Sequence, residues 1–374
     1  MPINNYDNYP MTWKPIIKPI AMPIYKQLIA QLVQDVKTRV LNPGDKMPPQ
    51  RELADFLDVN LTTITRVYKR GEELGILSAR VGKGTFISFD VNVDEQLLYN
   101  DQYQNIIQMA TIYPPYNGNY VFEQVVKDLV NQPRFNQLLE YQSPNGTIHQ
   151  REAVVKYLKK FSFFGKVQDL VITTGSQNAL AGILIGLFKT GDRIAVTELT
   201  FSGLKSIAKM QGINLIPIPN KIVKEGFPCE KFGEFLVSEH IQGIYLVPEQ
   251  NNPTTETLSE TSRKNIAETV KISGVILIED SINRVFCDEQ VTPLAMLAPE
   301  QTIYIFSTSK FMAAGLRIAY VFVPEKQMQL LSATMYNLNL MVSPFNLEIV
   351  TRIIESPVLE EIIDEKKQEL YQRD

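Results

Sequence analysis

Residues 46–87 read KMPPQRELADFLDVNLTTITRVYKRGEELGILSARVGKGTFI. Within this stretch, residues 51–57 place their apolar side chains on one face at helical spacing, and residues 62–74 do the same. The segment between them, residues 58–60, has the composition of a tight turn. Two short helices joined by such a turn predict a helix-turn-helix.

The sequence on either side completes a small domain. Residues 76–80 and 85–87 are strand-like, and the four residues 81–84 between them include two glycines, which suit a hairpin turn. Upstream, apolar side chains recur every four residues over residues 24–40, which predicts one amphipathic helix. Together these elements predict a winged helix that occupies residues 15–88.

The second helix of such a unit enters the major groove of DNA by its N-terminal end, where polar side chains contact bases and basic ones contact phosphates. The residues with suitable chemistry at that end are Asn60, Thr62, Thr63, Thr65 and Arg66. Basic residues that suit phosphate contacts are Lys69, Arg70, Arg80 and, in the wing, Lys83. The pattern alone leaves protein–protein contact open, because helix-turn-helix pairs serve that purpose as well.

This stretch resembles the GntR-type winged helix, whose pattern is approximately L-P-S-x-R-x-L-A, then G-V-x-R-x-T-V, then G-x-G-T-F-V. The matching residues are Arg51, Leu53, Ala54, Val59, Thr63, Gly75, Gly82, Gly84, Thr85 and Phe86. The resemblance implies that the domain binds double-stranded DNA and that Arg51 belongs to its contact residues. Two positions depart from the pattern, since Pro49 replaces a capping serine and Leu61 replaces an arginine that usually contacts DNA.

Composition divides the chain in the same way. Of the 374 residues, the first 90 contain 12 lysines and arginines against 9 acidic residues, whereas the remainder contains 25 against 32. The whole chain has a net charge of -4, which argues against a wholly basic nucleic-acid binder. Two cysteines and two histidines lie far apart, so we expect no disulfide framework and no metal site. Without a signal peptide or an 18-residue apolar run, we expect a soluble, cytoplasmic protein with no membrane partner.

The remainder of the chain predicts an α/β domain. We expect a linker at residues 89–105 and one large domain at residues 106–374, in which strand-like runs alternate with helical patterns such as residues 179–188. The strand-like runs are residues 170–173, 193–196, 214–218, 244–247, 275–278 and 302–306. This alternation predicts a mostly parallel sheet covered by helices, and ligands of such sheets bind where the strands end.

Four predicted strand ends carry residues with functional chemistry. Gly175-Ser176-Gln177 lies between a strand and a helix, where backbone N–H groups suit a phosphate. Asn252 follows a second strand, and Asp280 follows the apolar run V-I-L-I-E. After a fourth strand comes S-T-S-K, which is Ser307 to Lys310, and Arg317 lies seven residues further on. Each feature alone is more typical of a solvated surface or a turn.

Taken together, these residues match the requirements of pyridoxal 5'-phosphate. The cofactor needs a lysine for a Schiff base, a carboxylate on its ring nitrogen and several donors for its phosphate. Lys310 and Asp280 meet the first two needs. The phosphate donors are Ser176, Ser307, Ser309 and Arg317.

The same residues resemble the class I aminotransferases of fold type I, whose S-x-S-K-x-x-x-P-G-L-R corresponds here to S-T-S-K-F-M-A-A-G-L-R. The resemblance implies catalytic roles for Lys310 and Asp280, contact of Asn252 with the ring hydroxyl, stacking of Phe201 on the ring, and phosphate contacts from Gln177. A GntR-type head joined to such a body is the arrangement of MocR-like regulators, which implies a homodimer.

Departures from the family pattern bear on activity. Ile282 stands where MocR-like proteins have a tyrosine that contacts the ring hydroxyl, Ala314 replaces a proline, and Ala319 replaces a glycine. Family members continue beyond a charged helix like residues 358–374 into a small C-terminal domain, so we expect that domain to be truncated here. The arginine that clamps a substrate carboxylate is expected to be missing with it.

The sequence therefore predicts a pyridoxal-phosphate-dependent transcription regulator that binds DNA and senses a small amine or amino acid through a Lys310 Schiff base. One alternative is an active aminotransferase with an accessory DNA-binding domain. Another is a DNA-binding protein whose body is a cofactor-free dimerisation scaffold.

Overall fold

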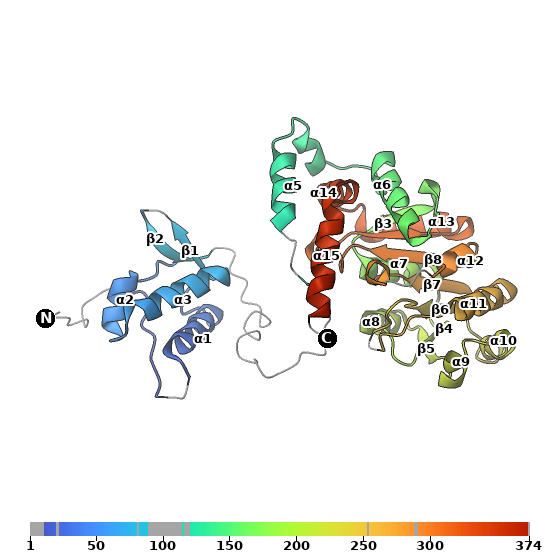
Figure 1. Ribbon diagram of the computed structural model, residues 1–374, viewed down its shortest axis with the longest axis horizontal. Helices are drawn as coiled ribbons and strands as arrows, with labels where there is room; N and C mark the ends of the chain where they lie inside the picture. The colour runs from blue at the N-terminus through green and yellow to red at the C-terminus, as the bar shows by residue number, and fades with distance from the viewer. Residues whose placement is uncertain are drawn as a thin grey trace. The chain divides into compact units, whose positions relative to one another are not determined.

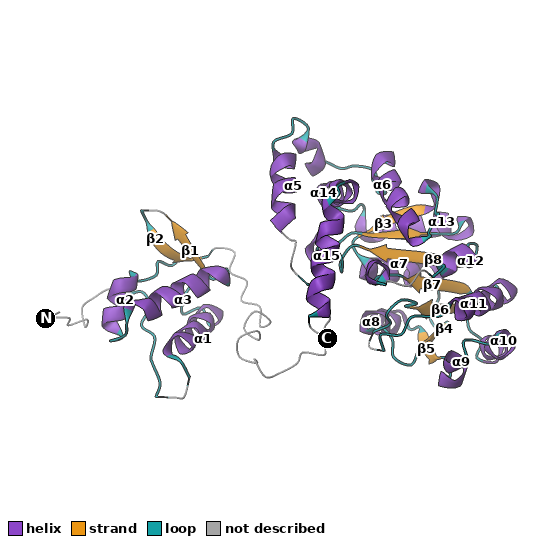
Figure 2. Cartoon of the chain, viewed as in Figure 1, coloured by secondary structure: helices purple, strands orange, loops and turns teal. Residues whose placement is uncertain are grey.

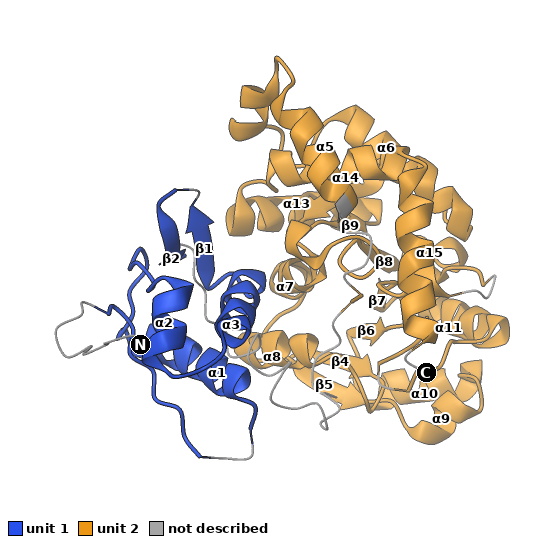
Figure 3. Cartoon of the chain, turned by 60° about the vertical axis from the view of Figure 1, so that its left-hand side comes forward, with its two compact units in different colours: residues 1–111 blue, residues 112–374 orange. Residues whose placement is uncertain are grey.

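A computed structural model of the chain forms two compact units, residues 1–111 and 112–374, shown in different colours in Figure 3. The residues that it describes are 11–19, 22–80, 82–88, 114–115, 120–252, 254–287 and 291–372. The linker predicted at residues 89–105 lies outside this set, so the predicted domain boundaries stay a prediction.

The described part of the first unit contains three helices and a hairpin (Figure 1). The helices are α1 (Ile24–Lys37), α2 (Gln50–Phe56) and α3 (Leu61–Glu73), and the strands are β1 (Leu77–Arg80) and β2 (Gly84–Ile87). The helices bury Leu28, Leu53 and Ile64, among others, in one core with Ile87 of the hairpin. The predicted winged helix is confirmed.

The second unit is built on a seven-stranded sheet, drawn in orange in Figure 2. In spatial order the strands are β3 (Leu170–Thr173), β9 (Ala319–Phe322), β8 (Thr302–Ser307), β7 (Ile276–Asp280), β6 (Gly243–Leu246), β4 (Arg193–Val196) and β5 (Asn214–Pro217). All neighbouring pairs are parallel except the two that involve β9. The mostly parallel sheet was predicted correctly, with all six expected strands, but β9 was missed.

Helices cover both faces of this sheet (Figure 2). One face packs against α7 (Ser176–Leu187), α8 (Ser202–Gln211) and α13 (Glu325–Asn339). The opposite face packs against helices that belong to two further core clusters. These are α6 (Ile148–Leu158), α9 (Asn220–Lys224), α10 (Cys229–Ser238), α11 (Glu260–Ser273), α12 (Leu294–Leu297), α14 (Pro344–Glu355) and α15 (Val358–Tyr371), while α5 (Tyr120–Val130) adds its apolar side to α14.

The two-residue period of the strands decides which side chains reach each face. On β8, Ile303 and Ile305 join the core beneath α7, whereas Tyr304 and Phe306 join the core on the opposite side. The same alternation applies on β7, where Ile278 belongs to the α7 side.

No helix in the described part of the chain is long and apolar enough to cross a membrane.

Candidate functional site

Three of the four strand ends that the sequence singled out carry the predicted catalytic and phosphate-binding residues. In a parallel sheet the carboxyl ends of the strands meet at one edge, where ligands bind. Strand β7 ends at Asp280, β8 is followed by Ser309 and Lys310, and β3 leads through Gly175 into α7.

The start of α7 forms a polar cradle with the segment that follows β8. Gly175 has a φ of 81°, and a Cβ at this position would collide with the guanidinium of Arg317. Arg317 Nη1 donates to Ser309 Oγ at 3.4 Å, and Ser307 Oγ donates to Ser309 Oγ at 3.2 Å. The N-cap residue of α7 is Gly175, which has no side chain to cap the first turn, so the N–H groups of this turn and Arg317 together suit an anion.

Ser176 and Gln177 occupy the first turn of α7 and differ in exposure. Ser176 is half-buried at the cradle, whereas Gln177 is exposed. The turn before the helix is held by Asn178, whose Oδ1 accepts from the backbone N–H of Thr174 at 3.1 Å. The structure therefore places Ser176 beside Gly175 in the cradle and leaves the Gln177 side chain at the surface.

Asp280 is a buried carboxylate that is only partly satisfied. Its Oδ2 accepts from the hydroxyl of Tyr245 at 2.8 Å, while its Oδ1 has no hydrogen-bond partner among the described residues. Burial raises the pKa of Asp280 to about 6, although the bond from Tyr245 pulls that pKa down. The open oxygen is thus the strongest sign of a ligand in this unit.

Lys310 lies close enough to Asp280 for each charge to affect the other. Burial lowers the pKa of the Lys310 amine, and the neighbouring Asp280 carboxylate offsets part of that effect. A lysine with a lowered pKa holds a larger share of neutral amine, which is the nucleophilic form. Asp280 thus ends β7, and Lys310 lies in the turn that follows the neighbouring strand β8.

Asn252 and Phe201 lie in loops at the ends of β6 and β4, respectively. Phe201 is half-buried against the α7-side core, at the residue that precedes α8. Asn252 is exposed, whereas its neighbour Asn251 is buried and donates through Nδ2 to Thr254 Oγ1 at 3.2 Å. The structure therefore brings Asp280 and Lys310 together but leaves the amide of Asn252 in solvent.

Behind Asp280 lies a buried ionic network that the sequence did not reveal. Arg263 of α11 donates to Glu249 Oε1 at 2.9 Å and lies 3.8 Å from Glu279 Oε1. Glu249 Oε2 accepts from Ser281 Oγ at 3.0 Å, so the network is joined to the residue after Asp280. Burial and the charge of Glu249 raise the pKa of Glu279 to about 8. An arginine in an amphipathic helix gives no sequence signal that it is buried.

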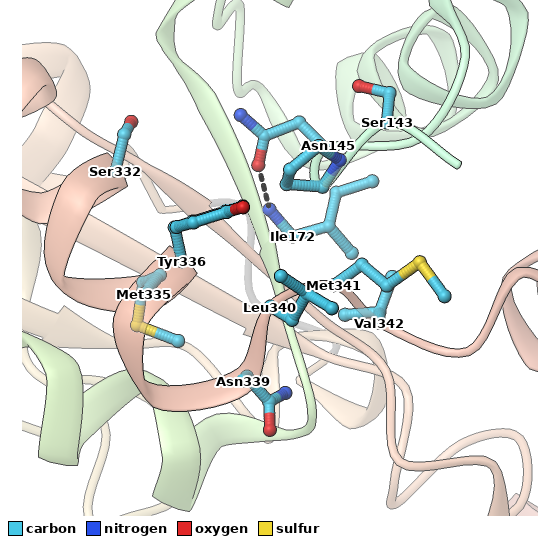
Figure 4. A pocket seen from close by; sticks show the side chains of 11 residues that line it. Ser143, Asn145, Ile172, Ser332, Met335, Tyr336, Asn339, Leu340, Met341 and Val342 are labelled. Carbon is cyan, nitrogen blue, oxygen red and sulfur yellow. Dashed lines mark hydrogen bonds between the residues drawn. The ribbon is translucent and has the colours of Figure 1, made fainter. Parts of the chain in front are cut away.

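A separate pocket opens beside β3 (Figure 4). It is lined by Asn145, Ile172, Tyr336, Asn339 and Leu340, among others. None of its lining residues is charged, and none belongs to the set predicted to bind the cofactor. This pocket is therefore distinct from the Asp280–Lys310 site.

In the first unit, the start of α3 presents a polar surface. Asn60, Thr62, Thr65, Arg66 and Lys69 are exposed, and Thr63 is half-buried. The Oδ1 atom of Asn60 caps α3 by accepting from the backbone N–H of Thr62 at 2.9 Å. Asn60 therefore has a structural task at this surface in addition to any contact with a base.

Contacts within this unit hold several of the polar side chains in place. The guanidinium of Arg66 lies 4.0 Å from the centre of the Tyr25 ring, and Thr65 Oγ1 donates to Gln50 Oε1 at 2.9 Å. Arg80 lies 5.3 Å from the centre of the Phe86 ring in the wing. Arg51 on α2 and Lys83 at the wing are exposed. The predicted contact residues thus lie on α2, α3 and the hairpin of one small domain.

Comparison with known proteins agrees with both halves of this description. Residues 24–87 match the gntR family of bacterial regulatory proteins, and residues 104–372 match aminotransferase class I and II. The uncharacterized HTH-type transcriptional regulator YdeF of Bacillus subtilis is 38% identical over 373 residues, covering 100% of this chain and 80% of YdeF. The chain belongs to the MocR-like family of transcriptional regulators.

Other MocR-like relatives are more distant. The HTH-type transcriptional regulator NorG of Staphylococcus aureus is 26% identical over 309 residues, covering 75% of this chain and 69% of NorG. Among solved structures, kynurenine aminotransferase of Pyrococcus horikoshii has a TM-score of 0.63 at 22% identity over 75% of this chain and 71% of its own. That likeness establishes the aminotransferase fold for the second unit of the MocR-like chain.

Proposed function

We propose that the chain is a DNA-binding regulator whose second unit holds pyridoxal 5'-phosphate and senses a small amine or amino acid through it. The observation that carries this proposal is Asp280 Oδ1, a buried oxygen without a hydrogen-bond partner among the described residues. Leaving such an oxygen unsatisfied costs free energy unless a ligand supplies a donor. The protonated ring nitrogen of the cofactor is a donor of the required charge.

The other residues around Asp280 fit the remaining parts of the cofactor. The uncapped start of α7, with Arg317 against Gly175 and Ser309 beside it, suits the phosphate. When bound, the cofactor supplies an aldehyde that forms a Schiff base with an amine and a ring that withdraws electrons. Lys310, with its lowered pKa, offers that amine. Ser176, Gln177, Phe201, Asn252 and Ser307 are assigned to the cofactor by resemblance.

The proposed response starts at Lys310. Lys310 would hold the cofactor through its amine, and an effector that supplies its own amine would release the Lys310 amine and so change which protein groups contact the cofactor. Such a difference in contacts shifts a conformational equilibrium of the body. In a homodimer, which the family resemblance implies, that shift changes the spacing of two DNA-binding heads and hence the fit to paired half-sites.

An absorption spectrum tests the cofactor half of the proposal. Purified protein with added pyridoxal phosphate should develop a visible band that borohydride reduction traps, and Lys310→Ala should lack both the band and the covalent adduct. Arg352→Ala, on a helix remote in sequence from every predicted site residue, serves as the control and should behave as the wild type. An unchanged free-cofactor spectrum in the wild type would leave the body as a cofactor-free scaffold.

A second assay separates regulation from catalysis. If the chain is a regulator of the proposed kind, an amine should alter operator binding of the wild type but not of Lys310→Ala. Steady conversion of an amino donor and a keto acid, abolished in Lys310→Ala, would instead favour a working aminotransferase. Stoichiometric binding of the amine without release of a keto acid supports the regulator.

A further inference from the structure

The hydroxyl of Tyr245 lies against Asp280 because of the register of two strands. Tyr245 on β6 pairs with Ile278 on β7 in a parallel ladder. Since alternate residues of a strand share a face, Asp280 lies on the same face as Ile278, two residues further along β7. The distance from Tyr245 Oη to Asp280 Oδ2 is 2.8 Å, and both side chains are buried.

Tyr245 acts as a hydrogen-bond donor under all ordinary conditions. Burial and the negative charge of Asp280 raise the pKa of its phenol well above the ordinary value, so the hydroxyl keeps its proton. The bond therefore runs from phenol to carboxylate, and a bond to a charged acceptor is stronger than one between neutral groups. The bond occupies Oδ2 and leaves Oδ1 as the oxygen without a partner among the described residues.

Two further contacts hold the backbone beside Asp280. Ser281, the next residue, donates to Glu249 Oε2 at 3.0 Å, and Arg263 donates to Glu249 Oε1 at 2.9 Å. The backbone at the end of β7 is therefore held from the opposite face of the sheet. The side chain of Ile282, which stands where the family has a tyrosine, offers no hydrogen bond to this site, whereas its backbone N–H helps to stabilise the Asp280 carboxylate.

We propose that Tyr245 is the positioning residue for Asp280, holding its carboxylate ionised and turned so that Oδ1 faces the ring nitrogen of pyridoxal phosphate. This inference rests on the proposed function and identifies a residue on which cofactor binding depends. Tyr245 touches neither the cofactor nor an effector in this arrangement. It acts through Asp280, and its effect on cofactor binding depends on the carboxylate at that position.

A double-mutant cycle on cofactor affinity tests the dependence. Pyridoxal phosphate is titrated into the full-length apoprotein of wild type, Tyr245→Phe, Asp280→Asn and the double variant, with the absorbance of the bound cofactor as the readout. Tyr245→Phe should weaken binding about 10-fold, the usual value of a hydrogen bond to a charged group. In the Asp280→Asn background the same change should have no further effect.

Tyr320→Phe is the matched control. Tyr320 is a buried tyrosine of the same sheet, on β9, and its hydroxyl has no hydrogen-bond partner among the described residues. Its removal should leave the affinity for pyridoxal phosphate unchanged. A purely structural role of Tyr245 would lower the melting temperature of Tyr245→Phe while leaving its cofactor affinity at the wild-type value.

The outcomes separate this inference from the function on which it rests. If the wild type binds no pyridoxal phosphate, the proposed function fails and the inference falls with it. If the wild type binds but Tyr245→Phe binds equally well, or if the two substitutions weaken binding additively, only the role of Tyr245 is wrong. Should Tyr245→Phe fail to fold, Tyr245→Met removes the hydroxyl with a side chain of similar reach and gives the same comparison.

Discussion

The candidate binding residues of the two units differ in their exposure to solvent. In the DNA-binding unit they are exposed side chains such as Arg66 and Lys83, whose polar groups water already satisfies. In the aminotransferase-like unit the decisive group is Asp280, which is buried and keeps one oxygen without a partner among the described residues. An exposed binding site therefore costs its domain little folding free energy. A buried carboxylate with an unsatisfied oxygen, in contrast, lowers the stability of the domain that contains it.

Glu279, the residue next to Asp280, allows a comparison of two neighbouring carboxylates within the second unit. Its two oxygens accept from the backbone N–H groups of Leu294 and Ala295 at 2.9 and 2.8 Å. Neighbouring carboxylates on one strand thus differ in whether the protein satisfies them. Full satisfaction indicates a structural role, and an open oxygen on the opposite face indicates a ligand.

The largest expected effect is on stability, from Arg263→Ala. Removing this cation leaves Glu249 buried without its partner and also removes donors to Pro248 and Leu258. We expect the free energy of unfolding of the second unit to fall by about 3 to 5 kcal/mol. Urea denaturation, monitored by circular dichroism, measures the free energy of unfolding. Arg352→Ala is the control, because the pair of Arg352 with Glu348 is partly exposed, and it should change that free energy by less than about 1 kcal/mol.

Asp280→Asn should change the pH dependence of stability in the apoprotein. The pKa of Asp280 is about 6 in the folded state and ordinarily 3.8, so the folded protein binds this proton more readily than the unfolded chain. The stability of the wild type should fall as the pH rises through this interval, by up to about 3 kcal/mol. The loss should be absent in Asp280→Asn. Parallel pH profiles for the two proteins would show that the carboxylate titrates normally.

Arg66→Ala should weaken operator binding by about 10-fold, in the range of a lost base or phosphate contact, with little change in stability. Tyr25→Leu removes the ring that holds the guanidinium and should produce a smaller loss, while Tyr25→Phe keeps the ring and should bind as the wild type. Fluorescence anisotropy with one operator duplex measures all three. Equal affinity of Arg66→Ala and wild type would remove Arg66 from the interface.

The smallest effect is expected from Lys83→Ala in the wing. Loss of one phosphate contact should weaken binding only a few-fold, by a similar factor for every DNA sequence, and should reduce the slope of log affinity against log salt by about 1. The salt series on specific and unrelated duplexes provides the test. A change confined to the specific duplex would assign Lys83 to a base instead.

Sequence reasoning succeeded where local patterns carry the information. Helical spacing and the glycine turn predicted the winged helix, and apolar runs predicted six strands of the sheet. Strand β9 was missed because its four residues begin two residues after Arg317, next to the stretch interpreted as a phosphate-binding segment. Asp280 was found because a carboxylate at the end of an apolar strand is unusual.

The partners of Asp280 lay beyond such reasoning. Tyr245 is 35 residues away from Asp280, and nothing in an apolar strand tells a packing tyrosine from a donor. Arg263 and Glu249 come together only through the tertiary fold, since a buried arginine and a solvated one give the same helical pattern. The exposure of Asn252, in contrast to the buried Asn251, is likewise set by the loop conformation.

The antiparallel strand β9 has a consequence for how the chain is made. Strand β3 lies at the edge of the sheet and pairs only with β9, and Thr173 is joined to Ala319 across 146 residues of sequence. Pairing at such a separation is slow, and during synthesis β3 must wait until β9 has left the ribosome. The winged helix, made from the first residues, is complete long before. The DNA-binding unit can therefore fold during synthesis before the α7 cradle forms.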